Sequence, residues 1–438
     1  MDVADPAPYN GWMCFRGGVL ALSCLTAASF APAQTASDPP AQLTLEQARQ
    51  LAVLHNSDYR VSQAQVAAAL AQLKINREYP NPTLGLNTAK ISTDGTPEGT
   101  PGNNTLTDRA YDSIASLSQL LLIAKRGVMQ DSAKAGVRAA ELQRDDARRL
   151  LLQAVTQDYA AALAARDQAA VLIQSAAKLR READIAAHRL QAGDLSRSDQ
   201  EQLEIAAEQD ELNAQAQRMT AKTAIINLEI LLGQAQPEGR SELKTTLEAL
   251  RREAPPDLES TPVAARPDVQ AASAVVEQAQ ANVQLQRRER IPDLTVSVQY
   301  ERNPPYQTNT VGVGVSLPLP LWNHNTGAIE AAQAARVQAD AQLDQRRLQA
   351  NADVAAARLA YHEASERARR YRESLLPKSA DAAKSVAYAY EKGGTSLVTL
   401  LDAERNDNLI RVAAVQAEAD TAATGVALLS ALGRLGGN

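Results

Sequence analysis

The chain has few of the residues that redox chemistry, metal binding or a wide aromatic core would need. Only two of its 438 residues are cysteine, Cys14 and Cys24, and both lie near the N-terminus. Disulfide bonds and cysteine-ligated metals are therefore excluded from everything that follows them. Aromatic residues make up 3% of the chain, too few to fill a broad core with large rings. The apolar residues are mostly alanine, leucine and valine, and alanine favours helix strongly.

Sequence patterns for catalysis, metal binding and nucleic-acid binding are also missing. The chain contains no glycine-rich phosphate loop, no HExxH and no GxSxG, so the common catalytic motifs are absent. No two of its four histidines have the spacing of metal ligands: His55, His188, His324 and His362. The net charge is −6, and no basic cluster lies beside stacking aromatics, as a nucleic-acid surface requires. We expect no enzyme activity, no cofactor, no metal site and no nucleic-acid partner.

The N-terminal segment has the pattern of an export signal. A short positive start over 13–16 precedes an apolar stretch from Gly17 to Phe30. Small residues then form a cleavage site, which predicts a signal peptide over 1–33 and a cut between Ala33 and Gln34. The start codon is open between Met1 and Met13. Acylation of Cys24 is an alternative, because Ala21-Leu22-Ser23-Cys24 resembles a lipoprotein box.

A repeat organises the remaining chain. Residues 58–84 align with 268–294 at an offset of 210, with four informative identities: Asp58/Asp268, Arg77/Arg287, Pro82/Pro292 and Leu84/Leu294. Further on the offset becomes 200, with matches such as Gly127/Gly327 and Gly193/Gly393. An insertion of ten residues between 85 and 115 accounts for the change. We predict a first structural repeat over 34–235, a linker over 236–262 and a second repeat over 263–438.

Each repeat has the pattern of helix, strand, loop, strand, very long helix, turn and helix. Helices are expected at 44–79, 125–192, 196–233, 263–290, 327–392 and 396–433, with β-hairpins at about 82–122 and 292–321. The 3-4-3 spacing of Leu152, Val155, Tyr159 and Ala162 is that of a coiled coil. Glycines at 193 and 393 predict sharp turns between antiparallel helices.

The hairpins alternate apolar with small or polar residues. Leu294, Val296, Val298 and Tyr300 alternate with Thr295, Ser297 and Gln299, which is the period-two pattern of strands. The chain has no run of 18 apolar residues after the expected signal, so a membrane would have to be crossed by strands. Four strands cannot close a membrane barrel, so several chains would have to contribute. The alternative is a soluble α+β domain with the apolar faces on a core.

Three segments resemble the TolC-like outer-membrane efflux family. Val315 to Gly327 contains Leu-Pro-Leu-Pro-Leu-Trp-Asn-His-Asn-Thr-Gly and resembles the family's second strand-to-helix junction. Ser118 to Gly127 resembles the first junction, and Gly393 to Ala403 resembles a periplasmic helix-turn-helix tip. Lys125-Arg126 fits the heavy-metal branch, typified by CzcC-like cobalt-zinc-cadmium components, whereas Leu120 and Ala124 depart from it.

The resemblance implies a mainly α fold with a β-barrel part. Three chains would contribute four membrane strands each to a 12-stranded barrel, and long antiparallel coiled-coil helices would form an α-barrel in the periplasm. The homotrimer would contact outer-membrane lipid, a periplasmic adaptor and an inner-membrane resistance-nodulation-division pump. It would be a passive exit duct for heavy-metal cations or, alternatively, for drugs or organic solvents. A periplasmic coiled-coil scaffold without a pore is the alternative from another class.

The junctions between strands and helices supply one set of candidate residues. Pro318 and Pro320 lack amide donors and are expected to end a strand, immediately before Trp322. Asn325 or Thr326 is expected to cap the following helix. At the other junction, Lys125 and Arg126 would face lipid phosphates or a water-filled lumen, or simply begin a solvated helix.

The helix tips supply the second set. The resemblance places rings of acidic residues at the periplasmic entrance, where Asp402 matches one position and Thr399 occupies the other. By the repeat, Asp199 corresponds to Thr399 and Gln202 to Asp402. Threefold symmetry would turn Asp199 and Asp402 into two carboxylate rings that favour cations. The alternative is that both are ordinary surface acids.

Overall fold

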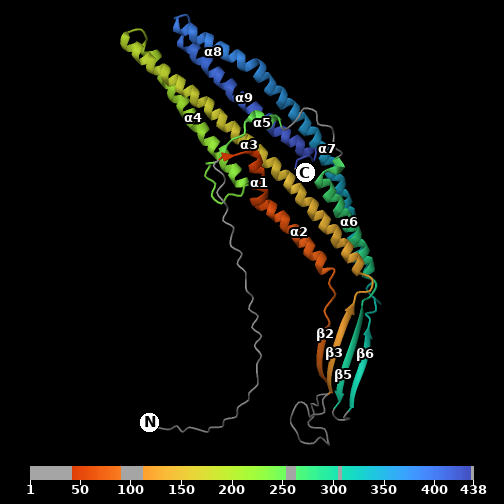
Figure 1. Ribbon diagram of the computed structural model, residues 1–438. Helices are drawn as coiled ribbons and strands as arrows, with labels where there is room; N and C mark the ends of the chain where they lie inside the picture. The colour runs from red at the N-terminus through yellow and green to blue at the C-terminus, as the bar shows by residue number, and fades with distance from the viewer. Residues whose placement is uncertain (1–41, 90–111, 253–262, 304–307, 436–438) are drawn as a thin grey trace, which may run out of the picture. The chain divides into compact units, whose positions relative to one another are not determined.

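The computed structural model describes residues 42–89, 112–252, 263–303 and 308–435. The expected signal peptide, with Cys24, Ala33 and Gln34, lies outside the described residues, as does the expected insertion in the first hairpin. The described part consists of long helices that lead into and out of four strands (Figure 1).

The helices are long and mostly uninterrupted. The longest, α3, has 67 residues and is about 100 Å long at 1.5 Å per residue. In chain order the helices are α1 (Leu45–His55), α2 (Ser57–Ile75), α3 (Arg126–Ala192), α4 (Arg197–Leu231), α5 (Leu247–Arg252), α6 (Pro267–Arg288), α7 (Thr326–Arg370), α8 (Leu376–Glu391) and α9 (Leu397–Ala431). A 3-10 turn, η1 (Val263–Ala265), precedes α6, and a π-helical turn, η3 (Tyr371–Leu375), joins α7 to α8. Among the described residues, no helix is long and apolar enough to cross a membrane.

The segment expected as one helix over 44–79 is divided at Asn56. This residue ends α1 and caps α2, because its side chain accepts a hydrogen bond of 3.0 Å from the Tyr59 amide. Its Nδ2 donates to the Leu231 carbonyl at 3.0 Å, so the break also ties α2 to the end of α4. An asparagine cap inside a helical pattern explains why periodicity alone missed the break.

The segment expected as a linker over 236–262 is structured as far as residue 252. Its strand β4 (Glu242–Leu243) pairs in parallel with β1 (Gln42–Leu43). Leu247 and Leu250 of α5 are buried in a cluster that includes Tyr159 of α3. The linker prediction was wrong for this part, because short elements of two residues and of one and a half turns leave almost no periodic pattern.

A buried carboxylate holds the turn between α4 and β4. Glu229 accepts hydrogen bonds from the amides of Gly239, Arg240 and Ser241 and from the Ser241 hydroxyl, at 2.7 to 3.1 Å. Burial alone would raise the pKa of Glu229, but these donors outweigh it and the pKa lies below its usual value. The carboxylate is therefore ionised in the folded chain and organises the turn around itself.

The four longer strands form one antiparallel sheet. Its order is β2 (Thr83–Ala89), β3 (Asp112–Leu121), β5 (Leu294–Asn303) and β6 (Thr308–Ser316). The two hairpins therefore join through β3 and β5, where Leu117 lies opposite Val298. The outer edges of β2 and β6 have no strand beside them among the described residues.

The register places large apolar side chains on one face of this sheet. Directly opposite residues share a face, and the pairs Leu84–Leu117, Val298–Val313, Val296–Val315 and Tyr300–Val311 all fall on the same one. These side chains do not cover a core, since Val313 is 76% exposed and Leu86 is 75% exposed. Apolar patches of this extent on a protein surface mark contact with a membrane or with another protein.

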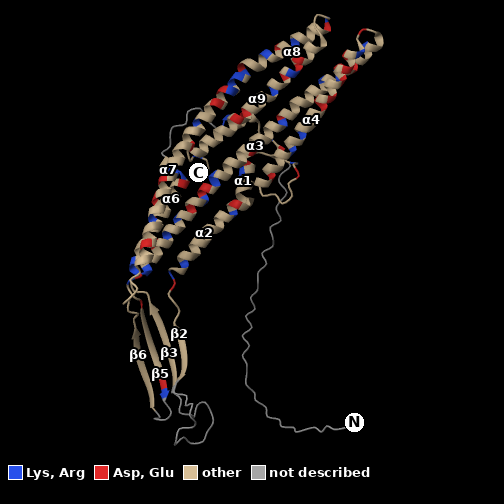
Figure 2. Ribbon diagram, turned by 180° about the vertical axis from the view of Figure 1, so that it is seen from behind, with Lys and Arg blue, Asp and Glu red and all other residues tan. Residues whose placement is uncertain are grey.

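The opposite face of the sheet is lined by small and polar side chains. Glycines pair with polar residues there: Gly85 with Ser116, Gly314 with Ser297 and Gly312 with Gln299. A Cβ atom on Gly85 or Gly314 would lie 2.7 Å from the partner's serine hydroxyl, so no larger residue fits without a shift. Figure 2 shows Lys, Arg, Asp and Glu spread along the helices and nearly absent from the strands.

Candidate functional site

Lys125 lies inside the first strand-to-helix junction. Its ammonium group is 2.8 Å from a carboxylate oxygen of Glu289 and 2.8 Å from one of Asp293. The Lys125 side chain is 8% exposed, so it faces neither lipid phosphates nor open solvent in this chain. It joins the start of α3 to the segment between α6 and β5 and holds the two hairpins together at their base.

Arg126 packs on the preceding helix-to-strand segment. Its guanidinium carbon lies 3.4 Å from the centre of the Tyr79 ring, a cation–π contact. Its Nη2 donates to the Arg77 carbonyl at 2.5 Å. Arg126 therefore ties α3 to the end of α2, which leads into β2.

The second junction turns through Pro318 and Pro320. Strand β6 ends at Ser316, immediately before this segment. Asn325 precedes α7 in the left-handed conformation, with φ 55°, and its side chain makes no cap hydrogen bond. Its Nδ2 donates instead to the Gln286 carbonyl at 2.9 Å, so the predicted capping role of Asn325 was wrong. Trp322 is 91% exposed and lies beside the apolar edge of the sheet.

The two helix tips have the same backbone design. Gly193 and Gly393 adopt left-handed φ values of 79° and 73°, which glycine accepts without steric cost. Ser196 then caps α4 by accepting from the Asp199 amide, and Ser396 caps α9 by accepting from the Thr399 amide. The tips also pack together, because Leu203 of α4 shares an apolar cluster with residues of α9, namely Leu397 and Leu400.

The predicted gate acids are placed differently at these tips. Asp402 is exposed on α9, whereas Asp199 is half-buried on α4. Burial raises the pKa of Tyr390, and the nearby carboxylates of Asp199 and Glu182 raise it further while Arg189 opposes them. Asp199 therefore lies close to the second tip. Within the described chain, neither Asp199 nor Asp402 is in an ion pair.

Polar contacts join the two helical hairpins below the tips. Lys178 of α3 pairs with the buried Glu404 of α9. Ser175 donates to Asp210 of α4 at 2.8 Å and accepts from Asn408 of α9. Sequence reasoning missed these residues, because the repeat gives no signal for them: Glu204, the counterpart of Glu404, is exposed.

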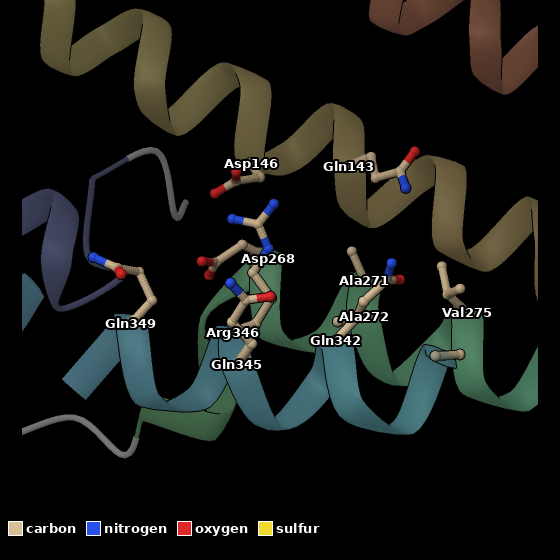
Figure 3. Close-up of a pocket in the computed structure, with 11 residues that line it drawn as sticks. Gln143, Asp146, Asp268, Ala271, Ala272, Val275, Gln342, Gln345, Arg346 and Gln349 are labelled. Atoms are coloured by element: carbon tan, nitrogen blue, oxygen red, sulfur yellow. The ribbon is translucent and has the colours of Figure 1, made fainter. Parts of the chain in front are cut away.

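A polar groove lies between α3 and α7, with α6 beneath it (Figure 3). Figure 3 shows Asp146, Asp268 and Arg346 pointing toward one another across the groove, with Gln143, Gln342 and Gln345 along its walls. In the part of the chain that the structure describes, no group of three His, Cys, Asp or Glu residues could hold a metal ion. The groove thus has hydrogen-bonding walls and no metal-ligand set.

The chain matches the model of the family described as outer membrane efflux protein, over residues 48–234 and 261–434. It is 28% identical over 253 residues to the cobalt-zinc-cadmium resistance protein CzcC of Cupriavidus metallidurans, a match that covers 57% of this chain. It is 26% identical over 414 residues to the pyoverdine export outer membrane protein OpmQ of Pseudomonas aeruginosa, with 89% of this chain and 85% of that protein covered. The chain spans only 60% of the length of CzcC.

A solved structure with the same fold is that of CusC, a protein that forms a transmembrane channel. The TM-score is 0.73 at 17% identity, and the match covers 89% of this chain and 92% of CusC. The predicted fold class, long coiled-coil helices with four strands per chain, is confirmed, and TolC-like channels of this fold form trimers. The family consists of outer-membrane channels that reach into the periplasm and are not enzymes. Since the family model matches most of the chain, the chain belongs to the outer membrane efflux protein family.

Proposed function

We propose that three copies of this chain form a passive exit duct in the outer membrane, fed by a periplasmic adaptor and an inner-membrane resistance-nodulation-division pump. The observation that carries the proposal is the sheet with one exposed apolar face and one small, polar face. Such a sheet suits lipid on one side and water on the other. A soluble domain would bury the apolar face, and a scaffold without a pore would not need it.

The free edges of the sheet support assembly from several copies. Strand β2 lies at one edge and β6 at the other. Unpaired backbone groups at a sheet edge cannot remain in lipid. Pairing β6 of one copy with β2 of the next satisfies both edges, and such a head-to-tail contact closes into a ring. A trimer of this kind would have 12 strands, three times the four in each chain.

Exposed apolar stripes on two helices support the same assembly. On α4, Ile205, Leu212 and Met219 recur every seven residues and are each at least 60% exposed. On α7, Val337, Leu348 and Leu359 recur every eleven residues and are each at least 65% exposed. Both spacings keep side chains on one helix face. These stripes are surfaces on which neighbouring copies would pack.

Heavy-metal cations are the cargo that we propose. The support is the likeness to CzcC, a cobalt-zinc-cadmium resistance protein, together with Lys125-Arg126 at the first junction. The second candidate is an organic cargo. It is favoured by the longer match to OpmQ, a pyoverdine export protein.

Deleting the gene in its host tests the cargo. We expect the growth-inhibiting concentrations of Zn²⁺, Co²⁺ and Cd²⁺ to fall several-fold, with those of hydrophobic antibiotics unchanged and both restored by the cloned gene. The opposite pattern, with antibiotics affected and metals not, would assign an organic cargo. Recovery of the protein in soluble fractions, with no heat-modifiable trimer in outer membranes, would point to the scaffold.

We propose that Asp199 and Asp402 form the cation-attracting rings at the periplasmic entrance. In the variant Asp199→Ala/Asp402→Ala, we expect the cation-to-anion permeability ratio of channels in planar bilayers to fall about twofold or more, because two rings of three carboxylates disappear. The matched control is Glu248→Ala, which removes an exposed acid of α5 that pairs with Arg252. Unchanged selectivity in the tip variant would rule out the gate rings.

A further inference from the structure

The second long helix contains an interruption that the first one lacks. Between α7 and α8, the turn η3 is π-helical, and the Leu376 amide reaches back to the Tyr371 carbonyl. Pro377 follows directly, and proline cannot donate the amide hydrogen bond of a regular helix. The corresponding position in the first repeat is Ala177, in the middle of the unbroken α3. A widened turn next to proline is a common site of helix bending.

The helix α8 is therefore a rigid rod between two flexible ends. It has 16 residues, with η3 at one end and the Gly393 turn at the other. Gly393 has a φ of 73°, and Gly394 donates to the Ala389 carbonyl at 2.8 Å. A change of angle at η3 would move the second tip without unfolding any helix.

A cavity beside η3 supplies room for such a movement. It measures about 410 Å³ and is lined by Tyr371 and Leu376 on the interrupted helix, Val171 on α3 and Leu247 on α5. Cores are normally packed without voids larger than a water molecule. The hinge thus borders empty space on the side where α3, α5 and α9 meet it.

One carboxylate holds the hinge in its present position. Glu418 of α9 lies 3.0 Å from the Arg372 guanidinium in η3 and 3.2 Å from that of Arg251 in α5. Its side chain is 24% exposed, and that of Arg251 is 32% exposed. The carboxylate therefore links the hinge, the helix behind it and the short helix of the segment between the repeats.

We infer that Glu418 is a gating residue that clamps η3 to α5 and α9, so that α8 swings outward when the clamp opens. This inference rests on the proposed function as a duct. The clamp is a bridge of two arginines around one acid, and it is partly shielded from solvent. Losing it leaves Arg372 and Arg251 with like charges facing each other, which pushes the hinge away from α5.

Single-channel recording of the reconstituted trimer tests the clamp. For Glu418→Gln we expect the open fraction to rise about threefold, the size of a partly exposed ion pair, and Arg251→Gln should give a similar rise. The matched control is Asp420→Asn. Asp420 also lies on α9 and pairs with Arg367 of α7 at 3.5 Å, but it does not touch η3. An open fraction for Glu418→Gln equal to that of Asp420→Asn would overturn the inference.

A distance measurement separates gating from damage to the fold. Spin labels on cysteines introduced at exposed Ser385 of α8 and Ser198 of α4 would report the separation of the tips, since the described residues contain no cysteine. We expect Glu418→Gln to lengthen or broaden this distance while heat-modifiable trimers persist. An unchanged distance would refute the clamp. A wild-type protein that forms no channel would refute the proposed function itself.

Discussion

Replacing Lys125 with alanine is expected to destabilise the folded chain by about 3–5 kcal/mol, the usual cost of breaking a buried ion pair by removing one partner. Lys125 lies within 2.8 Å of both Glu289 and Asp293 and is almost fully buried. Without it, two carboxylates remain close together with no cation, and Asp293 is itself mostly buried. Thermal unfolding in detergent, followed by the helical circular dichroism signal, should show a drop in Tm of several degrees.

The control for this variant is Lys134→Ala on the same helix. Lys134 pairs with Asp131 at 3.0 Å, but both side chains are more than half exposed. Exposed pairs of this kind contribute about 0–1 kcal/mol, so the control should unfold almost as the wild type does. The triple variant Lys125→Met/Glu289→Gln/Asp293→Asn should recover much of the loss, since no charge is left unpaired. Equal Tm values for Lys125→Ala and Lys134→Ala would contradict the structural role of Lys125.

The fold class was predictable because its signals are long and periodic. The helix α3 runs over 67 residues with hardly a breaker, and the strand β5 alternates strictly from Leu294 to Tyr300. The repeat offset then located the tips, where Gly193 and Gly393 have the same backbone conformation. Patterns of this length survive differences in local packing, so sequence alone was sufficient for them.

The junction residues show where such reasoning stops. Lys125-Arg126 could be located from its family-like run, but nothing in that run reveals that Lys125 turns inward to two acids 164 and 168 residues away along the chain. Asn325 was correctly placed before a helix, yet its side chain bonds to Gln286 of α6. The partners of a side chain depend on which helices pack together, and periodicity does not specify that.

Glu418 and Pro377 illustrate the same limit at the candidate gate. Pro377 is visible in the sequence, but one proline in a helical pattern of 65 residues from Thr326 to Glu391 weighs little against the pattern. The structure shows that the helix continues through a π-helical turn instead of ending. The clamp that Glu418 forms brings together α5, η3 and α9, which are far apart in the chain. Carboxylates on helices are usually solvated, so this one had no mark of its own.

The two repeats share one joint that only the structure reveals, and it leads to the second large effect. In the first repeat, Asn56 donates to the Leu231 carbonyl at the end of α4. At the equivalent position of the second repeat, Arg266 donates to the Ala431 carbonyl at the end of α9, at 3.3 Å. A neutral amide and a guanidinium thus serve the same connection between the entry helix and the returning helix.

The variant Arg266→Ala is expected to cost about 3–5 kcal/mol of stability, because it leaves buried acceptors without a donor. The Arg266 side chain is 4% exposed and lies 2.9 Å from Asp268 and 3.1 Å from Asp353. It also donates to the carbonyls of Ala350 and Ala431 at 3.3 Å. One side chain therefore ties α6, α7 and α9 together, and thermal unfolding in detergent should show the loss.

Two further variants separate the charge of Arg266 from its role as a joint. Arg347→Ala removes an arginine of α7 whose pair with Asp344 is largely exposed, so its Tm should stay near that of the wild type. Arg266→Asn introduces the side chain that serves this joint in the first repeat. It should remain nearly as destabilised as Arg266→Ala, because an amide cannot neutralise Asp268 and Asp353. Full stability of Arg266→Asn would mean that the backbone contact alone holds the joint and that the ion pairs contribute nothing.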